Sequence, residues 1–152
     1  MLMNNRLWNT KNPHQGRYKR VLCVCSAGLL RSPTAALVLS QEPYNYNTRA
    51  AGAMADFALV PVDGVLIDWA EEIVCMEQSH ANALQDNFDV SRKTIHVLGI
   101  PDNFAYRDSK LVELIKDRYK AIEAAAVAAA LQAIKPATSV EEHQDTSANT
   151  DF

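Results

Sequence analysis

Short apolar runs alternate with amphipathic segments over most of the chain. The first run, Val21 to Val24, is continuous rather than alternating, which is typical of a strand covered on both faces of a parallel sheet. Cys25 follows it directly. Helical periodicity then begins near Ser32 and Pro33, an N-cap type of residue followed by proline at a first helical position. This part of the chain therefore predicts a strand, a loop and a helix.

The alternation continues toward the C-terminus. We predict a strand at 46–51, a helix at 61–70, a strand at 73–76, a helix at 79–86 with Ser79 as its N-cap, and a strand at 94–98. A long helix begins at Asp108 or Ser109 after a loop. Strands and helices that alternate at this spacing predict right-handed βαβ units. The expected fold class is α/β, a three-layer sandwich with a four-stranded parallel sheet and helices on both faces.

The two ends of the chain differ from this pattern. The first twenty residues contain five basic and no acidic side chains and show no sustained period, whereas residues 136–152 contain four acidic side chains and no Lys or Arg. We expect a flexible basic arm at 1–18, a folded domain at 19–135 and a disordered acidic tail at 136–152. The alanine-rich stretch at 121–134 is predicted to be a packing helix rather than a membrane segment, because alanine favours helix by propensity.

Net charge and cysteine count argue against some classes of function. A formal net charge of -3 over 152 residues and a pI of about 5.8 argue against a nucleic-acid-binding surface. The three cysteines are odd in number and do not have disulfide-framework spacing. Since the N-terminal residues also lack the apolar core of a secretory signal, a cytoplasmic location with free thiols is expected. The sequence indicates neither a cofactor nor an oligomeric state.

The loop after the first strand carries the strongest chemical signal. Cys25 lies where the strand ends, at the edge of a parallel sheet where ligands bind, and Arg31 and Ser32 precede the helix. A nest of backbone N–H groups at a helix N-terminus would bind a phosphate-like oxyanion and favour a thiolate. Arg31 would add a planar fork for two oxygens, and Ser32 would donate to the sulfur. The predicted phosphate-binding amides are those of Ser26, Ala27, Gly28, Leu29, Leu30 and Arg31.

The segment Cys25-(x5)-Arg31-Ser32-Pro33 resembles the active-site loop of the low-molecular-weight protein tyrosine phosphatases, in a short bacterial or phage-type variant. The resemblance extends over about residues 20–123 and includes the stretches 49–52, 69–77 and 100–109. Gly28 stands where the family usually has asparagine, Leu30 replaces a second loop cysteine, and Asn103 replaces a proline. The resemblance implies the phosphotyrosine phosphatase I-like fold and a phosphocysteine mechanism that needs neither metal nor cofactor.

The late loop supplies the other residues that the resemblance implies. Asp102 would be the general acid that protonates the leaving oxygen and later activates water, which is the role that in-line attack by a thiolate requires. Asp108 is its nearest competitor but stands at a predicted helix N-cap. Phe104 and Tyr106 would form walls for a phenyl group. The implied partner is a protein phosphotyrosine or a small aryl phosphate, with no nucleic acid and no membrane involved.

Other interpretations remain open at this point. An arsenate reductase of the same fold would need a relay of thiols, for which Cys75 and Cys23 are the available candidates. A catalytically weak phosphate-binding or phosphopeptide-binding module would keep the phosphate-binding loop at 26–31, the anion cradle, without turnover. A phosphocysteine carrier would not need Arg31 and Asp102 together. Zinc binding lacks paired ligand spacing. A papain-like pair of Cys25 with His96 lacks an orienting partner.

Overall fold

The computed structural model describes residues 18–56 and 58–134, which divide into two compact units at 118/119. Within these residues the chain forms, in order, β1 (Arg20–Cys25), α2 (Arg31–Leu39), β2 (Asn47–Gly52), α3 (Gly64–Trp69), β3 (Glu72–Cys75), α4 (Gln78–Asn87), β4 (Thr94–Val97) and α5 (Ser109–Ile134). The arm predicted at 1–18 and the tail predicted at 136–152 lie outside the described residues, apart from Tyr18.

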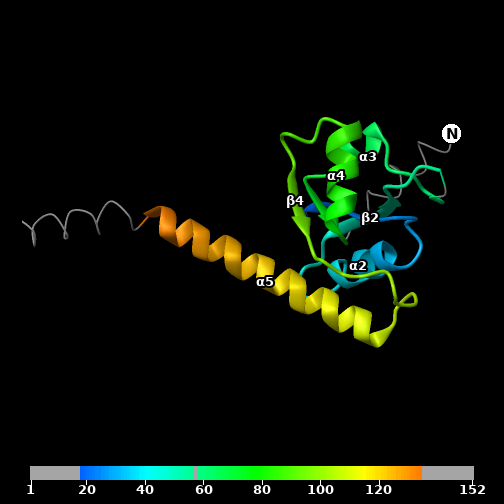
Figure 1. Ribbon diagram of the computed structural model, residues 1–152. Coiled ribbons are helices and arrows are strands. Elements are labelled where there is room, and N and C mark those ends of the chain that lie inside the picture. The colour runs from blue at the N-terminus through cyan, green and yellow to red at the C-terminus, as the bar shows by residue number, and fades with distance from the viewer. Residues whose placement is uncertain (1–17, 57, 135–152) are drawn as a thin grey trace, which may run out of the picture. The chain divides into compact units, whose positions relative to one another are not determined.

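The first unit contains a parallel four-stranded sheet with the order β2-β1-β3-β4. Helices lie on both sides of it, with α2 on the side opposite α3 and α4 (Figure 1). The predicted α/β fold class is therefore confirmed. β1 is a central strand with a neighbour on each edge, and all of its residues after Arg20 are buried. This explains why its sequence is a continuous apolar run rather than an alternating one.

The core follows from the alternation of side chains along β1. Leu22 and Val24 lie in a buried cluster with residues of α3 and α4, such as Leu66 and Leu84. Successive side chains of a strand point to opposite faces, so Val21 and Cys23, both fully buried, face the other layer. Both faces of β1 are thus covered, which holds its carboxyl end in a fixed place for the loop that follows.

Two helix caps differ from the sequence prediction. α2 begins at Arg31, with Leu30 as N-cap and no side-chain cap bond, so Ser32 lies inside the first turn rather than at the cap. α4 begins at Gln78 and is capped by Glu77 in a capping box, so the prediction of Ser79 as its N-cap is wrong. In both helices the expected cap was the nearest small hydroxyl residue. The hydroxyl of Ser32 instead contacts Cys25 Sγ.

The second unit, taken by itself, is described over residues 119–134, the C-terminal part of α5. Its larger aliphatic side chains are exposed at Val127, Leu131 and Ile134. Within residues 18–56 and 58–134, none of the helices combines the length and the apolar character needed to cross a membrane.

Candidate active site

Cys25 is the last residue of β1 and lies level with the ends of the neighbouring strands. It pairs in register with Gly52, the last residue of β2, and Val24 pairs with Cys75, the last residue of β3. Because the carboxyl ends of parallel strands meet at one edge of a sheet, the loops after β1, β2 and β3 converge there. The side chain of Cys25 is buried, with 3% of the residue exposed.

The loop after β1 curls back over the sulfur of Cys25. Gly28 has φ of +75°, the left-handed conformation that glycine adopts at little cost, and its N–H donates to Cys25 Sγ over 3.2 Å. The loop therefore makes a tight turn at this glycine. A Cβ at Gly28 would also lie 2.9 Å from the backbone of Ala51 and Gly52, so the site excludes larger residues for two reasons.

Ser32 gives the sulfur a second polar neighbour. Its Oγ lies 3.1 Å from Cys25 Sγ and 3.4 Å from the carbonyl oxygen of Ala51. The hydroxyl has one proton, so it donates either to the sulfur or to this carbonyl. A thiolate at Cys25 would accept from both the Ser32 hydroxyl and the Gly28 N–H.

Arg31 is the largest of the fully buried side chains in the described part of the chain. Its Nη1 donates to the carbonyl oxygen of Ile100 over 2.8 Å and to the carboxylate of Glu77, and its Nη2 lies 3.5 Å from Ser26 Oγ. A buried guanidinium needs such partners, because burying an unpaired charge is costly. These contacts fix the orientation of the fork before any ligand binds.

The loop that carries Asp102 is anchored on both sides and exposed in the middle. On one side the N–H of Ile100 donates to the Met76 carbonyl over 2.7 Å, and Arg118 Nη1 donates to the carbonyls of Leu98 and Gly99. On the other side the N–H of Arg107 donates to Thr34 Oγ1 over 3.0 Å, which ties the loop to α2.

Asp102 lies beside the guanidinium of Arg31. Its Oδ1 is 3.5 Å from Arg31 Nε, and 61% of its side chain is exposed. The separation is longer than a strong hydrogen bond, so the contact is a solvent-screened ion pair. The structure thus brings Asp102 to the residue predicted to bind phosphate and leaves its carboxyl group largely exposed. Asp108 instead accepts from the N–H of Lys110 at the start of α5, as an N-cap residue does.

The predicted aromatic walls differ in their surroundings. Phe104 is half-buried, whereas Tyr106 is 46% exposed and its ring lies 5.0 Å from the guanidinium carbon of Arg107. Other large apolar side chains are also exposed on the loops near Cys25, namely Leu29 at 47%, Leu30 at 40% and Met54 at 46%. The anion cradle therefore has exposed apolar side chains on the loops that form it.

The other two cysteines have a different environment. Cys23 and Cys75 are fully buried, and burial raises the pKa of both thiols, to about 12 for Cys75. A thiol with so high a pKa is a poor nucleophile and a poor redox partner at neutral pH. All three cysteines are free thiols. Within the described residues, no group of three His, Cys, Asp or Glu side chains is arranged to hold a metal ion.

The loop after β2 braces the cradle through its backbone. The N–H groups of Ala53 and Met54 donate to the carbonyls of Cys25 and Ser26, over 2.8 Å and 3.0 Å. This approach depends on Gly52, where a Cβ would lie 2.7 Å from the Ser26 carbonyl oxygen and 2.6 Å from the Ala58 side chain. Gly52 is therefore required for the packing of the two loops.

We expect Gly52→Ala to lower the free energy of unfolding by about 1–3 kcal/mol, because the added methyl group has to displace backbone atoms. Gly64→Ala is the matched control, since a Cβ there meets nothing within 4 Å, and it should change stability by less than about 1 kcal/mol. Urea unfolding of the two variants measures both. Equal stabilities would contradict the packing role of Gly52.

Sequence reasoning missed Glu77 and His80. Glu77 pairs with Arg31, and His80 accepts from the Glu77 N–H through Nδ1 over 3.0 Å and contacts Ser26 Oγ through Nε2 over 3.0 Å. One signal was available, because Glu77 comes two residues after the end of β3, at the same sheet edge as Cys25. The role of His80 required the tertiary structure.

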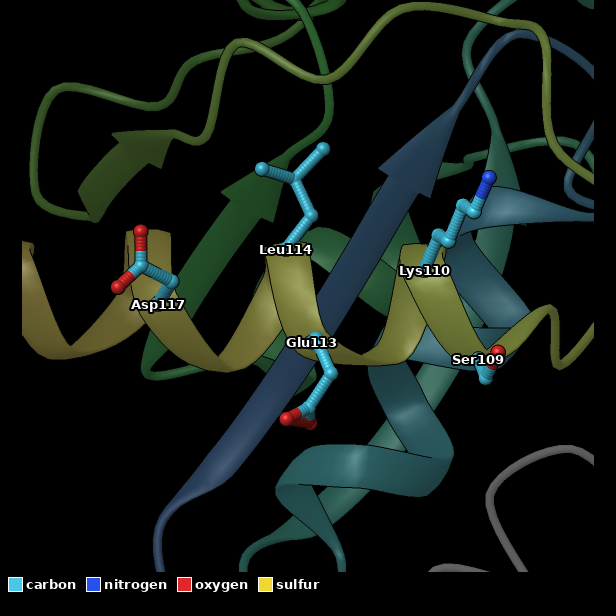
Figure 2. A pocket seen from close by; sticks show the side chains of 5 residues that line it. All are labelled: Ser109, Lys110, Glu113, Leu114 and Asp117. Carbon is cyan, nitrogen blue, oxygen red and sulfur yellow. The ribbon is translucent and has the colours of Figure 1, made fainter.

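A separate surface pocket of about 590 Å³ lies along the first turns of α5 (Figure 2). Lys110, Leu114 and Asp117 project from one side of the helix and Glu113 from the other (Figure 2). All of its lining residues come from this helix, and none belongs to the loops around Cys25. Because the polar side chains diverge, we assign no ligand to this pocket.

No protein-family model and no curated protein sequence matches the chain. Solved structures do match it. Wzb of Vibrio vulnificus in complex with benzylphosphonate has a TM-score of 0.56 at 21% identity, and the match covers 68% of this chain and 96% of Wzb. The low molecular weight phosphotyrosine phosphatase of Vibrio cholerae O395 has a TM-score of 0.53 at 19% identity, with 70% and 95% covered.

The YwlE arginine phosphatase from Geobacillus stearothermophilus is similar as well, with a TM-score of 0.53 at 20% identity, over 77% of this chain and 95% of YwlE. Each of these structures is covered almost completely, so the likeness concerns a whole fold rather than a shared strand and helix. Together with the parallel sheet of order β2-β1-β3-β4, these matches establish that the chain has the α/β fold of the low molecular weight phosphotyrosine phosphatases.

Proposed function

We propose that the protein is a cysteine-dependent phosphatase that hydrolyses phosphotyrosine or aryl phosphate monoesters. The observation that carries this proposal is the arrangement around one sulfur atom. Cys25 Sγ accepts from the Gly28 N–H and contacts Ser32 Oγ, at the N-terminus of α2 and beside a buried Arg31. These features favour a thiolate and, at the same place, an oxyanion. The similarity to solved phosphatases supports the same conclusion through the fold.

The proposed reaction has two steps. The Cys25 thiolate attacks phosphorus in line and forms a phosphocysteine, while Asp102 gives its proton to the departing oxygen. Water then attacks the phosphocysteine, and Asp102 takes a proton from it as the sulfur leaves. Arg31 and the loop amides of residues 26–31 hold the transferring oxygens, which is the largest stabilising contribution expected for such a cradle. Ser32 stabilises the sulfur as a leaving group by donating to it.

The surroundings of the cradle favour an aromatic leaving group. Phe104 and Tyr106 lie on the same loop as Asp102, and Leu29 and Leu30 are exposed on the phosphate-binding loop. A phenyl ring would bury part of this apolar surface. Benzylphosphonate, the ligand named for the Vibrio vulnificus Wzb structure, is a phosphonate with a phenyl group, which fits the same substrate class.

The burial of the other cysteines weighs against the arsenate reductase alternative. That chemistry passes a disulfide along several thiols, and Cys23 and Cys75 are both fully buried thiols with raised pKa. A relay thiol has to be accessible and readily ionised. The structure contains no such thiol other than Cys25 in the part of the chain that it describes.

The purified protein should hydrolyse 4-nitrophenyl phosphate without added metal between about pH 5 and pH 7. The measurement is release of nitrophenol over a pH series in the presence of a chelator. A chelator control with metal added back separates this reaction from a metal-dependent one. No turnover at any of these pH values, with inorganic phosphate still bound, would indicate the binding module instead.

A further inference from the structure

The hydroxyl of Ser26 lies between two groups that belong to different elements. Ser26 follows Cys25 in the anion cradle, and its Oγ lies 3.0 Å from His80 Nε2 on α4 and 3.5 Å from Arg31 Nη2 on α2. His80 is 2% exposed, whereas Ser26 is partly exposed at the surface of the loop. The direction of each hydrogen bond follows from the chemistry of the partners.

The backbone of Glu77 determines the tautomer of His80. The Glu77 N–H donates to His80 Nδ1 over 3.0 Å, so Nδ1 has a free lone pair and no proton. A neutral imidazole has one N–H, which must then be on Nε2. His80 Nε2 therefore donates to Ser26 Oγ.

Arg31 is also the donor in its contact with Ser26. A guanidinium has only donors, so the weaker contact from Arg31 Nη2 also points its hydrogen at Ser26 Oγ. Ser26 Oγ then accepts from two side chains. Its own hydrogen remains to be donated, and among the described residues no acceptor for it is in contact. The Ser26 hydroxyl is left as a donor within the loop that surrounds the Cys25 sulfur.

We propose that the Ser26 hydroxyl is a further catalytic group that donates to an oxygen of the bound phosphoryl group. His80 is the positioning residue in this proposal: by donating to Ser26 Oγ, it leaves the Ser26 hydrogen for the phosphoryl oxygen. This inference rests on the proposed function, because it assigns an additional ligand for the same phosphoryl group. The capping histidine joins the start of α4 to the cradle.

Burial and the charge of Arg31 favour the neutral form of the His80 ring. Burial lowers the pKa of His80, the guanidinium of Arg31 lowers it further, and the carboxylates of Glu77 and Asp102 oppose this. A protonated ring would have a hydrogen on Nδ1 and would lose the bond from the Glu77 N–H. Because the pKa is lowered, the neutral ring persists to lower pH than that of an exposed histidine.

Two substitutions of His80 separate its structural role from its positioning role. In His80→Asn, the side-chain oxygen can accept from the Glu77 N–H as Nδ1 does, but no donor reaches Ser26. In His80→Gln, the amide nitrogen can take the place of Nε2 and donate to Ser26, whereas the cap to Glu77 is lost. A structural role predicts that Gln is the more damaging change, and the positioning role predicts that Asn is.

The test measures kcat/KM for 4-nitrophenyl phosphate and the dissociation constant for inorganic phosphate by calorimetry. Ser26→Ala should lower kcat/KM and phosphate affinity by about 10-fold or more, the usual effect of a hydrogen bond to a charged group. His80→Asn should lower both by about 3-fold to 10-fold, and His80→Gln by less than about 3-fold. In the Ser26→Ala background, His80→Asn should have no further effect, because His80 acts through Ser26.

Failure of this inference is distinct from failure of the proposed function. An active wild-type protein with an unchanged Ser26→Ala variant overturns the inference alone. An inactive wild-type protein contradicts the proposed phosphatase activity. In that case the phosphate affinities of the wild type and of Ser26→Ala still test whether Ser26 contacts the bound phosphate. The ¹⁵N chemical shifts of the His80 ring test the tautomer without any substitution. A proton on Nδ1 rather than Nε2 would overturn the positioning role even if the His80 variants do not fold.

Discussion

Cys25→Ser should abolish turnover of 4-nitrophenyl phosphate, with a loss of kcat of about four orders of magnitude or more. The hydroxyl of serine is a far weaker nucleophile than a thiolate held by Gly28 and Ser32. Binding of inorganic phosphate should persist, because the loop amides and Arg31 are unchanged. Calorimetry with phosphate and a turnover assay on the same preparation measure the two effects separately.

Cys75→Ala is the matched control for this substitution. Cys75 is a buried thiol at the end of β3, so its replacement should cost some stability and leave kcat within about 2-fold of the wild type. If Cys75→Ala instead removes activity as completely as Cys25→Ser, the reaction uses more than one thiol. That outcome would favour the arsenate reductase alternative over the phosphatase.

Asp102→Asn should lower kcat by about 100-fold to 1,000-fold for phenyl phosphate, because the phenolate then leaves without a proton. The loss should be much smaller for 4-nitrophenyl phosphate, whose leaving group is stable as an anion. This dependence on the leaving group identifies a general acid. Steady-state rates with both substrates measure it, and phosphate affinity should not fall, since the substitution removes a carboxylate beside Arg31.

Two further carboxylates test the assignment of Asp102. Asp108→Asn should leave kcat unchanged, because asparagine caps a helix as well as aspartate does and Asp108 caps α5. Glu77→Gln should weaken the ion pair that orients Arg31, and it should lower kcat similarly for both substrates. If either variant shows the strong leaving-group dependence in place of Asp102→Asn, that carboxylate is the acid.

Local sequence determined the features that depend on neighbouring residues. The continuous apolar run of β1 indicated a strand buried on both faces, and the spacing of the strands indicated a parallel sheet. The left-handed turn of the loop falls on Gly28, a residue that adopts this conformation at low cost. The position of Cys25 at the edge of the sheet followed from the same pattern. These inferences succeeded because backbone geometry and burial constrain residues that are adjacent in the chain.

Helix starts were less predictable, because a cap depends on which partner a side chain finds. Ser32 was expected to cap α2, but its hydroxyl lies against the sulfur of Cys25, and the helix begins two residues earlier than expected. Ser79 was expected to cap α4, but Glu77 does so together with His80. In each case a contact made by the folded chain competed with the local preference for a serine cap.

The sequence by itself determined the α/β fold and the place of Cys25, Arg31 and Asp102 along the chain. Only the tertiary structure decided that Arg31 is shared among Glu77, Ile100 and Asp102, and that Ser26 meets His80, 54 positions away. The physical reason is that hydrogen-bond partners across a parallel sheet come from the ends of different strands. Their separation in sequence shows no period, and which donor faces which acceptor is settled only when the sheet has formed and its loops have packed.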